Sequence, residues 1–277
     1  MSPRTCGVVG DPIEHSLSPV LHRAGYETLG LDWTYDAHRV PSGGLPKFFS
    51  GLDAGWRGLS LTMPLKREAV PLVDRLTETA TATGAVNTVL LEADGTIVGD
   101  NTDLPGAVAA INERWAGPLK KATILGAGAT ATSVGLALCR LGVEEVRLLV
   151  RSPERAAETV TALRADPTAP QVEVGLLDES YRAPGDIVVS TVPAAAQTPV
   201  LVEAMLTAPC LFDVIYDPWP TPLAAAVRGS VISGLDLLVH QAALQFTLFT
   251  GHPAPLEEMR RAGELALSQR RPKGSDA

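Results

Sequence analysis

The sequence is poor in cysteine, and the spacing of the few cysteines excludes two common roles. Only three of the 277 residues are cysteines, and Cys6, Cys139 and Cys210 lie far apart. An odd number at wide spacing is not a disulfide framework, and no two have the close spacing of zinc ligands. We expect each thiol to pack as a small hydrophobic group, and we expect no metal site.

Basic residues and long apolar runs are also scarce. The 23 lysines and arginines are outnumbered by 31 aspartates and glutamates, which gives a net charge of −8. This acidic balance disfavours binding to nucleic acid or to an anionic membrane surface. There is no apolar run of about 18 residues, the length that crosses a membrane. Residues 1–4 lack the apolar core of an export signal. We therefore expect a cytoplasmic protein without nucleic-acid or membrane partners.

The sequence is rich instead in apolar residues arranged in alternating patterns. Hydrophobic residues make up 45% of the chain and charged residues 19%, which is typical of a globular protein with a sizeable core. The length suits two domains of about 100–200 residues each. Strand-like runs alternate with helix-like runs, which predicts an α/β fold. The expected strands are residues 5–10, 33–38, 58–64, 85–91, 122–125, 146–150, 186–190, 210–214 and 230–233.

Two segments near the N-terminus carry sharper local expectations. Ser18 before Pro19 predicts a capping residue followed by a helix. Strict alternation of apolar and polar residues over 58–64 predicts a strand with one apolar face and one polar face. One face would carry the apolar side chains and the other the polar ones, that is, Leu59, Leu61 and Met63 against Ser60 and Thr62.

A glycine-rich turn in the second half of the chain has the features of a dinucleotide-binding site. Gly126, Gly128 and Ala131 match the pattern G-x-G-x-x-A. The turn follows the expected strand over 122–125 and precedes an expected helix over 133–141, and this context distinguishes it from an ordinary tight turn. Glycines let the backbone approach a pyrophosphate, whose charge the amides at a helix N-terminus stabilise. The residues expected to bind the dinucleotide are Gly126, Ala127, Gly128 and Ala129.

The end of the next strand indicates which dinucleotide is bound. Proteins that bind NAD usually carry a carboxylate there, which bonds the ribose 2′-hydroxyl. Here Arg151 and Ser152 come first after the strand. A guanidinium group suits a 2′-phosphate because it can donate two charge-assisted hydrogen bonds to it. The sequence therefore predicts NADP, held by Arg151, Ser152 and, from the following turn, Arg155. Ser152 is also expected to cap a helix that starts at Pro153.

Polar residues of the first segment gather at strand ends or in short loops, where open α/β sheets bind ligands. They are Ser16, Ser18, Ser60, Thr62, Lys66, Asn87 and Asp103. The two serines beside a helix N-terminus suit a carboxylate, and the set suits a small polyhydroxylated acid. Lys66 and Asp103 could form a catalytic pair in which the lysine exchanges a proton with an alcohol oxygen. A surface salt bridge, or no contact, is the alternative that these two residues leave open.

Seven segments in order carry a resemblance to one enzyme family. They are residues 10–19 (GDPIEHSLSP), 61–66 (LTMPLK), 84–88 (GAVNT), 99–103 (GDNTD), the turn at 126–129 (GAGA), Tyr216 with residues 221–223 (TPL), and residues 234–242 (GLDLLVHQA). On these motifs the chain resembles the shikimate dehydrogenase family over essentially its whole length. Five or more ordered motifs are far more specific than any one of them.

The resemblance implies an NADP-dependent oxidoreductase of the shikimate pathway, which serves aromatic amino-acid biosynthesis. Such an enzyme reduces 3-dehydroshikimate to shikimate reversibly, with NADPH as the reductant. The implied fold is a substrate-binding α/β domain over residues 1–104 and 236–277, with an NADP-binding Rossmann domain over 105–235 inserted between. Family members occur as monomers and as homodimers, and either is expected here.

The resemblance also implies a role for each matching residue. The catalytic pair corresponds to Lys66 and Asp103. The residues that hold the substrate carboxylate correspond to Ser16, Ser18, Thr62 and Tyr216. Those that bond the ring hydroxyls correspond to Asn87, Asp103 and Gln241, the last on an expected helix over 236–250. The residues expected to complete the cofactor site are Thr191, Val192, Gly234 and Leu237.

Three positions depart from the family pattern. Ser60 and Val150 each stand where many members have asparagine, and residues 190–192 read Ser-Thr-Val in place of Asn-Ala-Thr. Two alternatives stay open. The chain could be a quinate/shikimate dehydrogenase that uses NAD, or a non-catalytic regulatory homologue that binds NADP. The presence of both Lys66 and Asp103 favours an enzyme.

Overall fold

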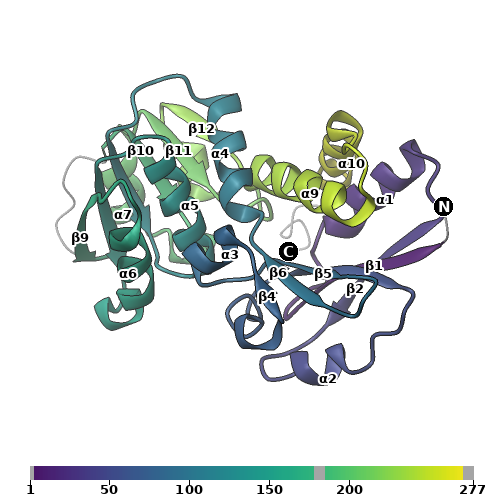
Figure 1. The fold of residues 1–277 in the computed structure, drawn as a ribbon. Coiled ribbons are helices and arrows are strands. Elements are labelled where there is room, and N and C mark those ends of the chain that lie inside the picture. Colours follow the sequence, from purple (N-terminus) through teal and green to yellow (C-terminus); the bar gives the residue numbers. More distant parts are fainter. Residues whose placement is uncertain (1–2, 178–184, 271–277) are drawn as a thin grey trace. The chain divides into compact units, whose positions relative to one another are not determined.

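Two sheets organise the chain, one in each of two units (Figure 1). The computed structural model describes residues 3–177 and 185–270. The first unit comprises Met1–Thr102 and Leu238–Ala277, and the second comprises Asp103–Leu237. The chain passes between the units after Thr102 and after Leu237. The sequence-based boundaries were after residues 104 and 235, so each differs by two residues.

The first unit is built on a mixed six-stranded sheet. Its described elements are β1 (Arg4–Gly10), α1 (Ser18–Thr28), β2 (Trp33–Arg39), α2 (Leu45–Phe49), β3 (Trp56–Leu61), η1 (Val70–Leu72), β4 (Arg75–Leu76), α3 (Glu78–Thr83), β5 (Thr88–Leu91), β6 (Ile97–Asp100) and α10 (Leu256–Ser268), together with most of α9 (Gly234–Thr250). The strand order is β2-β1-β3-β5-β6-β4. β1 pairs in parallel with β2 and β3, whereas β5 is antiparallel to β3 and β6.

Alternation along the strands divides the side chains of this sheet between two cores. Val9 of β1 and Leu59 and Leu61 of β3 lie in the core that α2 helps to cover. The opposite face packs against α1 and α9 (Figure 1). There Phe249 of α9 approaches the backbone of β3 closely: a Cβ on Gly58 would lie only 2.3 Å from its ring. The absence of a side chain at Gly58 allows this approach. The period of two thus decides which core each strand residue enters.

The second unit is built on a six-stranded parallel sheet. Its described elements are α4 (Asp103–Arg114), β7 (Lys121–Leu125), α5 (Ala129–Arg140), β8 (Glu145–Val150), η2 (Pro153–Ala156), α6 (Ala157–Ala165), β9 (Gln171–Leu176), β10 (Ile187–Ser190), η3 (Ala194–Ala196), α7 (Pro199–Met205), β11 (Cys210–Asp213), α8 (Pro222–Ala226) and β12 (Ser230–Ile232), with the start of α9. The order β9-β8-β7-β10-β11-β12 is the Rossmann order, in which the first and fourth strands of the unit lie side by side. The α/β fold and the Rossmann type of this unit are therefore confirmed.

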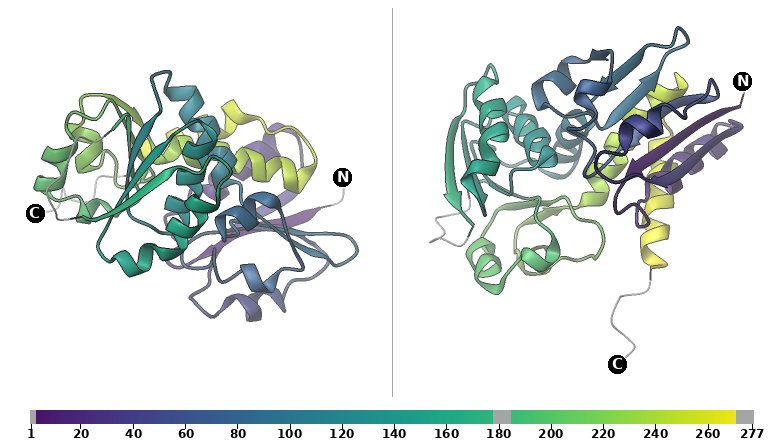
Figure 2. Two further views of the ribbon diagram at one scale, coloured as in Figure 1. Left: turned by 60° about the vertical axis from the view of Figure 1, so that its left-hand side comes forward. Right: turned by 90° about the horizontal axis from the view of Figure 1, so that it is seen from below.

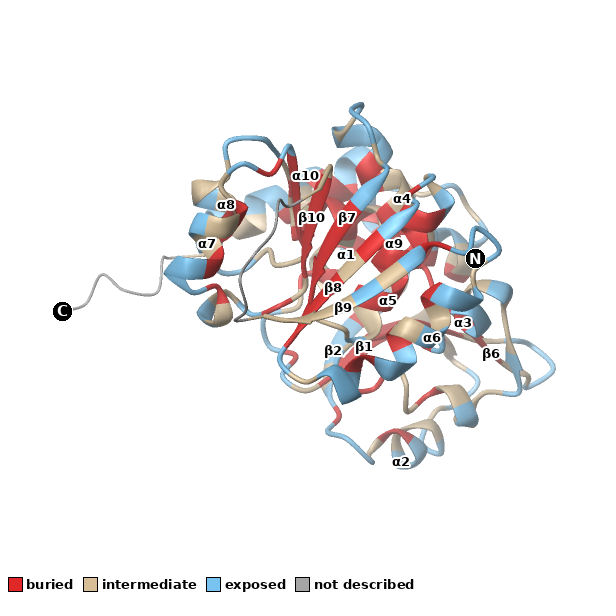
Figure 3. Ribbon diagram, turned by 90° about the vertical axis from the view of Figure 1, so that its left-hand side faces the viewer, coloured by how far each residue is buried: buried red, intermediate tan, exposed pale blue. Residues whose placement is uncertain are grey.

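Helices cover both faces of the parallel sheet, as Figure 2 shows. On one face α4, α5 and α6 bury Ile124 and Val189, and on the other α7 and α8 bury Leu125 and Val188. Figure 3 shows β7, β8 and β10 as largely buried strands, with exposed residues along β9 at the sheet edge. Because β9 is half exposed, it lacks the apolar run that marks the inner strands, and the sequence did not predict it.

The structure corrects two local predictions near the N-terminus. Ser18 is the first residue of α1 and does not cap it. Instead, Ser16 Oγ accepts a hydrogen bond from the backbone N–H of Ser18, at 3.3 Å. The strand expected over residues 58–64 ends at Leu61, because the chain turns at Thr62, whose carbonyl accepts from the N–H of Leu65 at 2.9 Å. Met63 therefore lies outside the strand and is 64% exposed.

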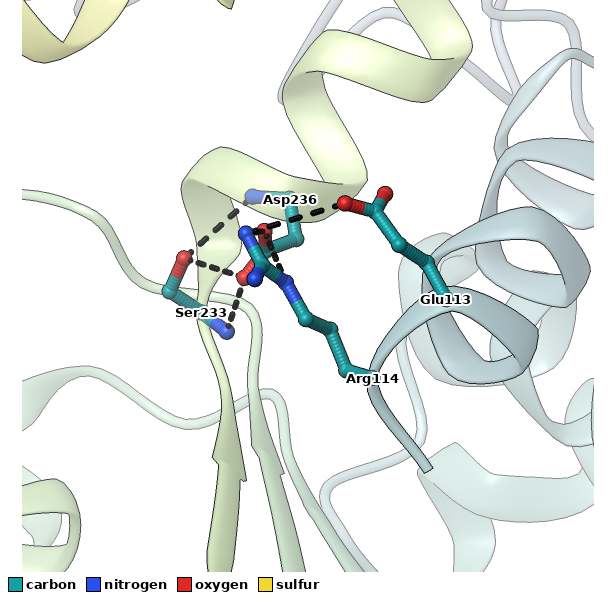
Figure 4. Close-up of polar contacts among 4 residues, drawn as sticks. All are labelled: Glu113, Arg114, Ser233 and Asp236. Atoms are coloured by element: carbon teal, nitrogen blue, oxygen red, sulfur yellow. Dashed lines mark hydrogen bonds and ion pairs between the residues drawn. The ribbon is translucent and has the colours of Figure 1, made fainter. Parts of the chain in front are cut away.

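The start of α9 is tied to the end of α4 within the second unit (Figure 4). The N–H and the hydroxyl of Ser233 donate to Asp236 Oδ2, and the N–H of Asp236 returns a bond to Ser233 Oγ. This reciprocal arrangement is a capping box with an aspartate. Arg114 of α4 donates two further bonds to Asp236 Oδ1, at 2.8 and 3.0 Å. Burial alone raises the pKa of Asp236, but the bonds from Ser233 and Arg114 outweigh it and lower that pKa.

Candidate active site

The glycine-rich turn follows the carboxyl end of β7, at the centre of the second sheet. The strand order reverses between β7 and β10, and open α/β sheets bind their ligands at such a point. Gly126 has a φ of +103°, and a Cβ on it would lie 2.5 Å from Thr191 Oγ1. Thr191 follows β10 and donates its hydroxyl to the carbonyl of Leu125, at 2.8 Å. Only glycine fits at position 126.

The second glycine of the turn has open space above it. Gly128 is exposed and immediately precedes α5, and a Cβ on it would meet no atom within 4 Å. The turn is supported from inside, because Thr159 Oγ1 donates to the carbonyl of Ala127 at 2.9 Å and lies 2.7 Å from Thr132 Oγ1. The first amides of a helix have no partner within the helix. A fixed turn, an open approach and a helix N-terminus together suit a pyrophosphate.

Two arginines follow β8, where the sequence predicts the binding of a 2′-phosphate. Arg151 and Arg155 are exposed, and within residues 3–177 and 185–270 neither side chain has a hydrogen bond or ion pair. Ser152 precedes η2 but does not cap it with its side chain, so this prediction is wrong. Its hydroxyl donates to Glu154 Oε2 at 2.6 Å, a charge-assisted hydrogen bond to the carboxylate two residues on.

A buried carboxylate organises the loops that follow β10 and β11. Asp213 is fully buried at the end of β11, and its Oδ2 accepts from Gln197 Nε2 at 2.9 Å and Thr221 Oγ1 at 2.6 Å. Gln197 Nε2 also lies 3.2 Å from Ser190 Oγ, at the end of β10. Burial raises the pKa of Asp213, and these bonds partly offset the rise. The segment from 214 to 220, which carries the half-buried Tyr216, is therefore held at both ends.

Three further residues expected at the cofactor site, Gly234, Leu237 and Val192, are packed against the rest of the second unit. Gly234 begins α9, and a Cβ on it would lie 2.2 Å from the carbonyl oxygen of Val214. The N–H of Gly234 donates to the carbonyl of Ile215 at 3.2 Å. Leu237 lies in the core under α4 and α5, and Val192 is buried against α7. Their contacts to a cofactor stay predictions.

In the first unit, Asn87 and Gln241 meet in a buried network. Asn87 Nδ2 donates to Thr102 Oγ1 at 3.0 Å and to Gln241 Oε1 at 3.4 Å. Asn87 Oδ1 accepts from the N–H of Thr102 at 2.7 Å and from the hydroxyl of Thr88 at 2.8 Å. The fold thus brings together two residues that are 154 positions apart in the chain. Thr102 joins them; it lies in the motif at residues 99–103, but no role of its own was predicted for it from the sequence.

A second buried network contains Ser60, one of the positions that depart from the family pattern. Ser60 is 4% exposed and donates its hydroxyl to Gln245 Oε1, at 2.7 Å. Its oxygen also lies 2.5 Å from the hydroxyl of Tyr35. Gln245 in turn donates to the carbonyl of Asn87 at 3.1 Å and to Thr88 Oγ1 at 2.9 Å. A serine at position 60 therefore connects β3 to α9 inside the unit.

The remaining polar residues of this unit lie near the ends of β1 and β3. Ser16 is half-buried in the loop after β1, and Ser18 is buried at the start of α1. Thr62 donates its backbone N–H to the carbonyl of Val9, at 3.0 Å. Lys66 is half-buried, and its carbonyl accepts from the N–H of Val86 at 2.7 Å. These contacts fix the backbone at the carboxyl ends of two neighbouring strands.

Asp103 and Tyr216 belong to the second unit. Asp103 is the first residue of α4 and is 5% exposed. A carboxylate is favoured at a helix N-terminus by the helix dipole. Its pairing with Lys66, and the joint action of Tyr216 with the two serines, stay predictions.

Grouped metal ligands, membrane-spanning helices and disulfides are not found within residues 3–177 and 185–270. In that part of the chain no three histidine, cysteine, aspartate or glutamate side chains are grouped so as to hold a metal ion. No helix there has the length and apolar character needed to span a membrane. The three cysteines are buried and unpaired, and burial is the main cause that raises the pKa of the Cys6 thiol to about 12.

Comparison with known proteins places the chain among one group of enzymes. Residues 8–89 match the model of the shikimate dehydrogenase substrate binding domain, and residues 234–262 match that of the shikimate 5′-dehydrogenase C-terminal domain. A shikimate dehydrogenase (NADP(+)) of Moorella thermoacetica is 36% identical over 273 residues, which cover 94% of this chain and 92% of the relative.

Solved structures agree over nearly the whole length. The crystal structure of Mycobacterium tuberculosis shikimate dehydrogenase has a TM-score of 0.85 and 37% identity, and the match covers 95% of this chain and 100% of that one. Shikimate 5-dehydrogenase of Thermus thermophilus, solved with NADP(H) and shikimate, has a TM-score of 0.81 and 31% identity, with 95% and 99% covered.

Proposed function

Because the chain belongs to the shikimate dehydrogenase family, we propose that it interconverts 3-dehydroshikimate and shikimate with NADP(H). The observation that carries the proposal is the 36% identity, over 94% of the chain, to a relative named as an NADP-dependent shikimate dehydrogenase. The fold is consistent with it, since the glycine-rich turn lies at the point where the strand order of a Rossmann sheet reverses.

The residues after β7, β8 and β10 fit NADP. The open space over Gly128 and the N-terminus of α5 would receive the pyrophosphate. Arg151 and Arg155, both exposed, would bind the 2′-phosphate together with Ser152. Bound NADP supplies or accepts the hydride. The residues proposed to line its nicotinamide half are Thr191, Val192, Gly234 and Leu237.

The first unit would supply most of the contacts to the substrate. Ser16, Ser18 and Thr62, with Tyr216 of the second unit, would hold the carboxylate. Asn87 and Gln241 would bond the ring hydroxyls, and their hydrogen bond to each other and to Thr102 supports this role. Side chains held in this way keep one orientation, so little ordering is needed when the substrate binds.

Lys66 and Asp103 would carry out the proton transfer. In the reducing direction Lys66 gives a proton to the oxygen of the former carbonyl group, while the carbon receives the hydride. In the oxidising direction the lysine takes the proton back. Asp103 bonds a neighbouring hydroxyl and orients the lysine. A positioned proton-transfer group contributes about 10²–10⁴-fold to the rate.

A matrix of two substrates and two cofactors tests the proposal. Purified protein is mixed with shikimate or quinate and with NADP or NAD, and reduction is followed at the nicotinamide absorbance band. The expected result is the highest kcat/KM for shikimate with NADP. Preferential turnover of quinate with NAD would support a quinate/shikimate dehydrogenase that uses NAD. Cofactor binding without turnover would support a non-catalytic regulatory protein. Either result contradicts the proposal.

We also propose that the enzyme works in the cytoplasm as a monomer or a homodimer. Its three cysteines are unpaired and buried, which fits a reducing compartment, where disulfides are rare. Light scattering of the purified chain measures its oligomeric state, and cell fractionation followed by the shikimate assay measures its location.

A further inference from the structure

The site expected to bind the 2′-phosphate contains a carboxylate as well as arginines. Glu154 lies in η2, directly after β8, and its Oε2 accepts the hydroxyl of Ser152 at 2.6 Å. Pro153 between them restricts the backbone, and the N–H of Arg155 donates to the carbonyl of Ser152 at 3.2 Å. Glu154 is therefore held against one of the groups that would bind the phosphate.

The carboxylate is charged, and its partner is the serine. The hydrogen bond from Ser152 is the main side-chain cause that lowers the pKa of the exposed Glu154, together with a bond to its own backbone N–H. The side chains of Arg151 and Arg155 make no ion pair within residues 3–177 and 185–270. Glu154 is therefore close in sequence to Arg151 and Arg155, but its carboxylate forms no ion pair with either of them within the described residues.

We propose that Glu154 is a specificity-determining residue, whose negative charge limits the preference of this enzyme for NADP over NAD. This inference rests on the proposed function, since it concerns the same cofactor site. A 2′-phosphate bound by Ser152 would bring two negative charges close to the carboxylate, and like charges at short distance repel. The 2′-hydroxyl of NAD carries no charge and can donate a hydrogen bond to a carboxylate, as it does to the acidic residue that NAD-binding proteins usually carry at the end of the corresponding strand.

Two fragments separate the effect of the phosphate from the rest of the cofactor. Adenosine 2′,5′-bisphosphate carries the 2′-phosphate, and adenosine 5′-monophosphate carries the free 2′-hydroxyl. The Kd of each is measured by titration calorimetry, without substrate and without turnover. The selectivity is the ratio of the two constants. It is measured for the parent protein, for Glu154→Gln, which keeps an acceptor for Ser152, and for Glu154→Ala, which does not.

Glu144→Gln is the matched control. Glu144 is exposed and changes the net charge equally, but it lies just before β8, at the opposite end of this strand from Glu154. In both Glu154 variants we expect selectivity for the 2′-phosphate to rise about fivefold, the upper range for one exposed charge pair. The gain in selectivity should shrink in 0.5 M salt, because the Debye length falls there to about 4 Å. Glu144→Gln should leave the selectivity unchanged.

The possible outcomes distinguish this inference from the proposed function. Unchanged selectivity in Glu154→Gln overturns the inference, as does a gain in Glu154→Ala alone, because the freed serine hydroxyl would then be the cause. If the parent protein binds neither fragment, the proposed cofactor site is itself wrong. The NADP to NAD ratio of kcat/KM, measured with shikimate, should rise in parallel in the two Glu154 variants.

Discussion

Thr221 Oγ1 donates a hydrogen bond to the buried Asp213 Oδ2 at 2.6 Å and thereby closes the base of the loop that carries Tyr216. The same hydroxyl accepts from the N–H of Ala224, at 3.1 Å, and so caps α8. One side chain thus holds the end of β11, the start of α8 and the segment between them.

The first prediction concerns this closure. Thr221→Val removes the donor and the cap while keeping the shape, so we expect the free energy of unfolding to fall by about 1–3 kcal/mol. KM for shikimate should rise more than kcat falls, because Tyr216 would lose its fixed position. Urea unfolding and steady-state kinetics measure both quantities. Thr221→Ser keeps the hydroxyl and should restore both, and a valine variant with parent KM would contradict the positioning role.

The second prediction concerns proton transfer. Lys66→Ala should lower kcat by about 10²–10⁴-fold and leave KM comparatively unchanged, because the lost proton donor acts mainly in the transition state. Lys47→Ala, which removes an exposed lysine of α2, is the control and should retain parent kinetics. Near-normal turnover in the Lys66 variant would show that the acid–base assignment is wrong.

The third prediction concerns acid stability. His22 is fully buried against the ring of Tyr35, with centroids 4.1 Å apart, and burial lowers its pKa to about 3. The folded protein therefore keeps His22 neutral, whereas the unfolded chain takes up a proton below the ordinary pKa of about 6.5. The contribution of His22 to stability is complete above that pH and is lost as the pH falls toward 3.

This linkage costs about 1.4 kcal/mol of unfolding free energy per pH unit between about pH 6 and pH 4. His22→Phe has no proton to take up, so its stability should fall less steeply over that interval by the same amount. Urea titrations at each pH measure both slopes. Equal slopes in parent and variant would contradict the prediction, whatever the absolute stability of the variant.

The fourth prediction concerns the packing of α9 on β3. A Cβ on Gly58 would lie 2.3 Å from Phe249 and 2.8 Å from the carbonyl oxygen of Val89. Since that oxygen is backbone, Gly58→Ala should cost about 1–3 kcal/mol of stability, as overpacking does. Gly51→Ala is the control, because its nearest neighbour would lie at an ordinary 3.5 Å. The midpoints of urea unfolding compare the two, and equal midpoints would be inconsistent with this packing.

The fifth prediction concerns the ion pair between α4 and α9. Arg114→Ala leaves the buried Asp236 without two of its donors, which should cost about 1–3 kcal/mol. The side chain of Glu113 is 36% exposed and lies 3.8 Å from Arg114, so this contact is looser. Glu113→Gln should therefore cost less than about 0.5 kcal/mol of stability. Thermal unfolding of the two variants checks the order, and a larger loss with Glu113→Gln would reverse it.

Local patterns were sufficient for the frame of the fold. The inner strands β7 and β10 are short and mostly apolar, and the turn at Gly126 combines a strand, glycines and a helix, so both were predictable. β9 was missed because an edge strand mixes exposed and half-buried residues. Ser233 and Asp236 do carry a readable capping signal, S-x-x-D, which was overlooked in the sequence.

Side-chain roles were less predictable than elements. Ser152 was expected to cap a helix, and its hydroxyl bonds Glu154 instead. Ser60 was expected on the polar face of a strand, and it is buried against Gln245, 185 residues further on. Asp213 is the acidic residue that ends the apolar strand β11, so the sequence marks its position. Its partners, Gln197 and Thr221, lie at positions that no local pattern connects to it.

The sequence by itself determined where strands and helices form, which strand residues share a face, and which turn needs glycine, because these follow from neighbouring residues and from backbone sterics. Only the tertiary structure decided which polar groups meet. Asn87 and Gln241, or Asp213 and Thr221, come together because packing of the sheets and helices leaves buried donors and acceptors that must satisfy one another.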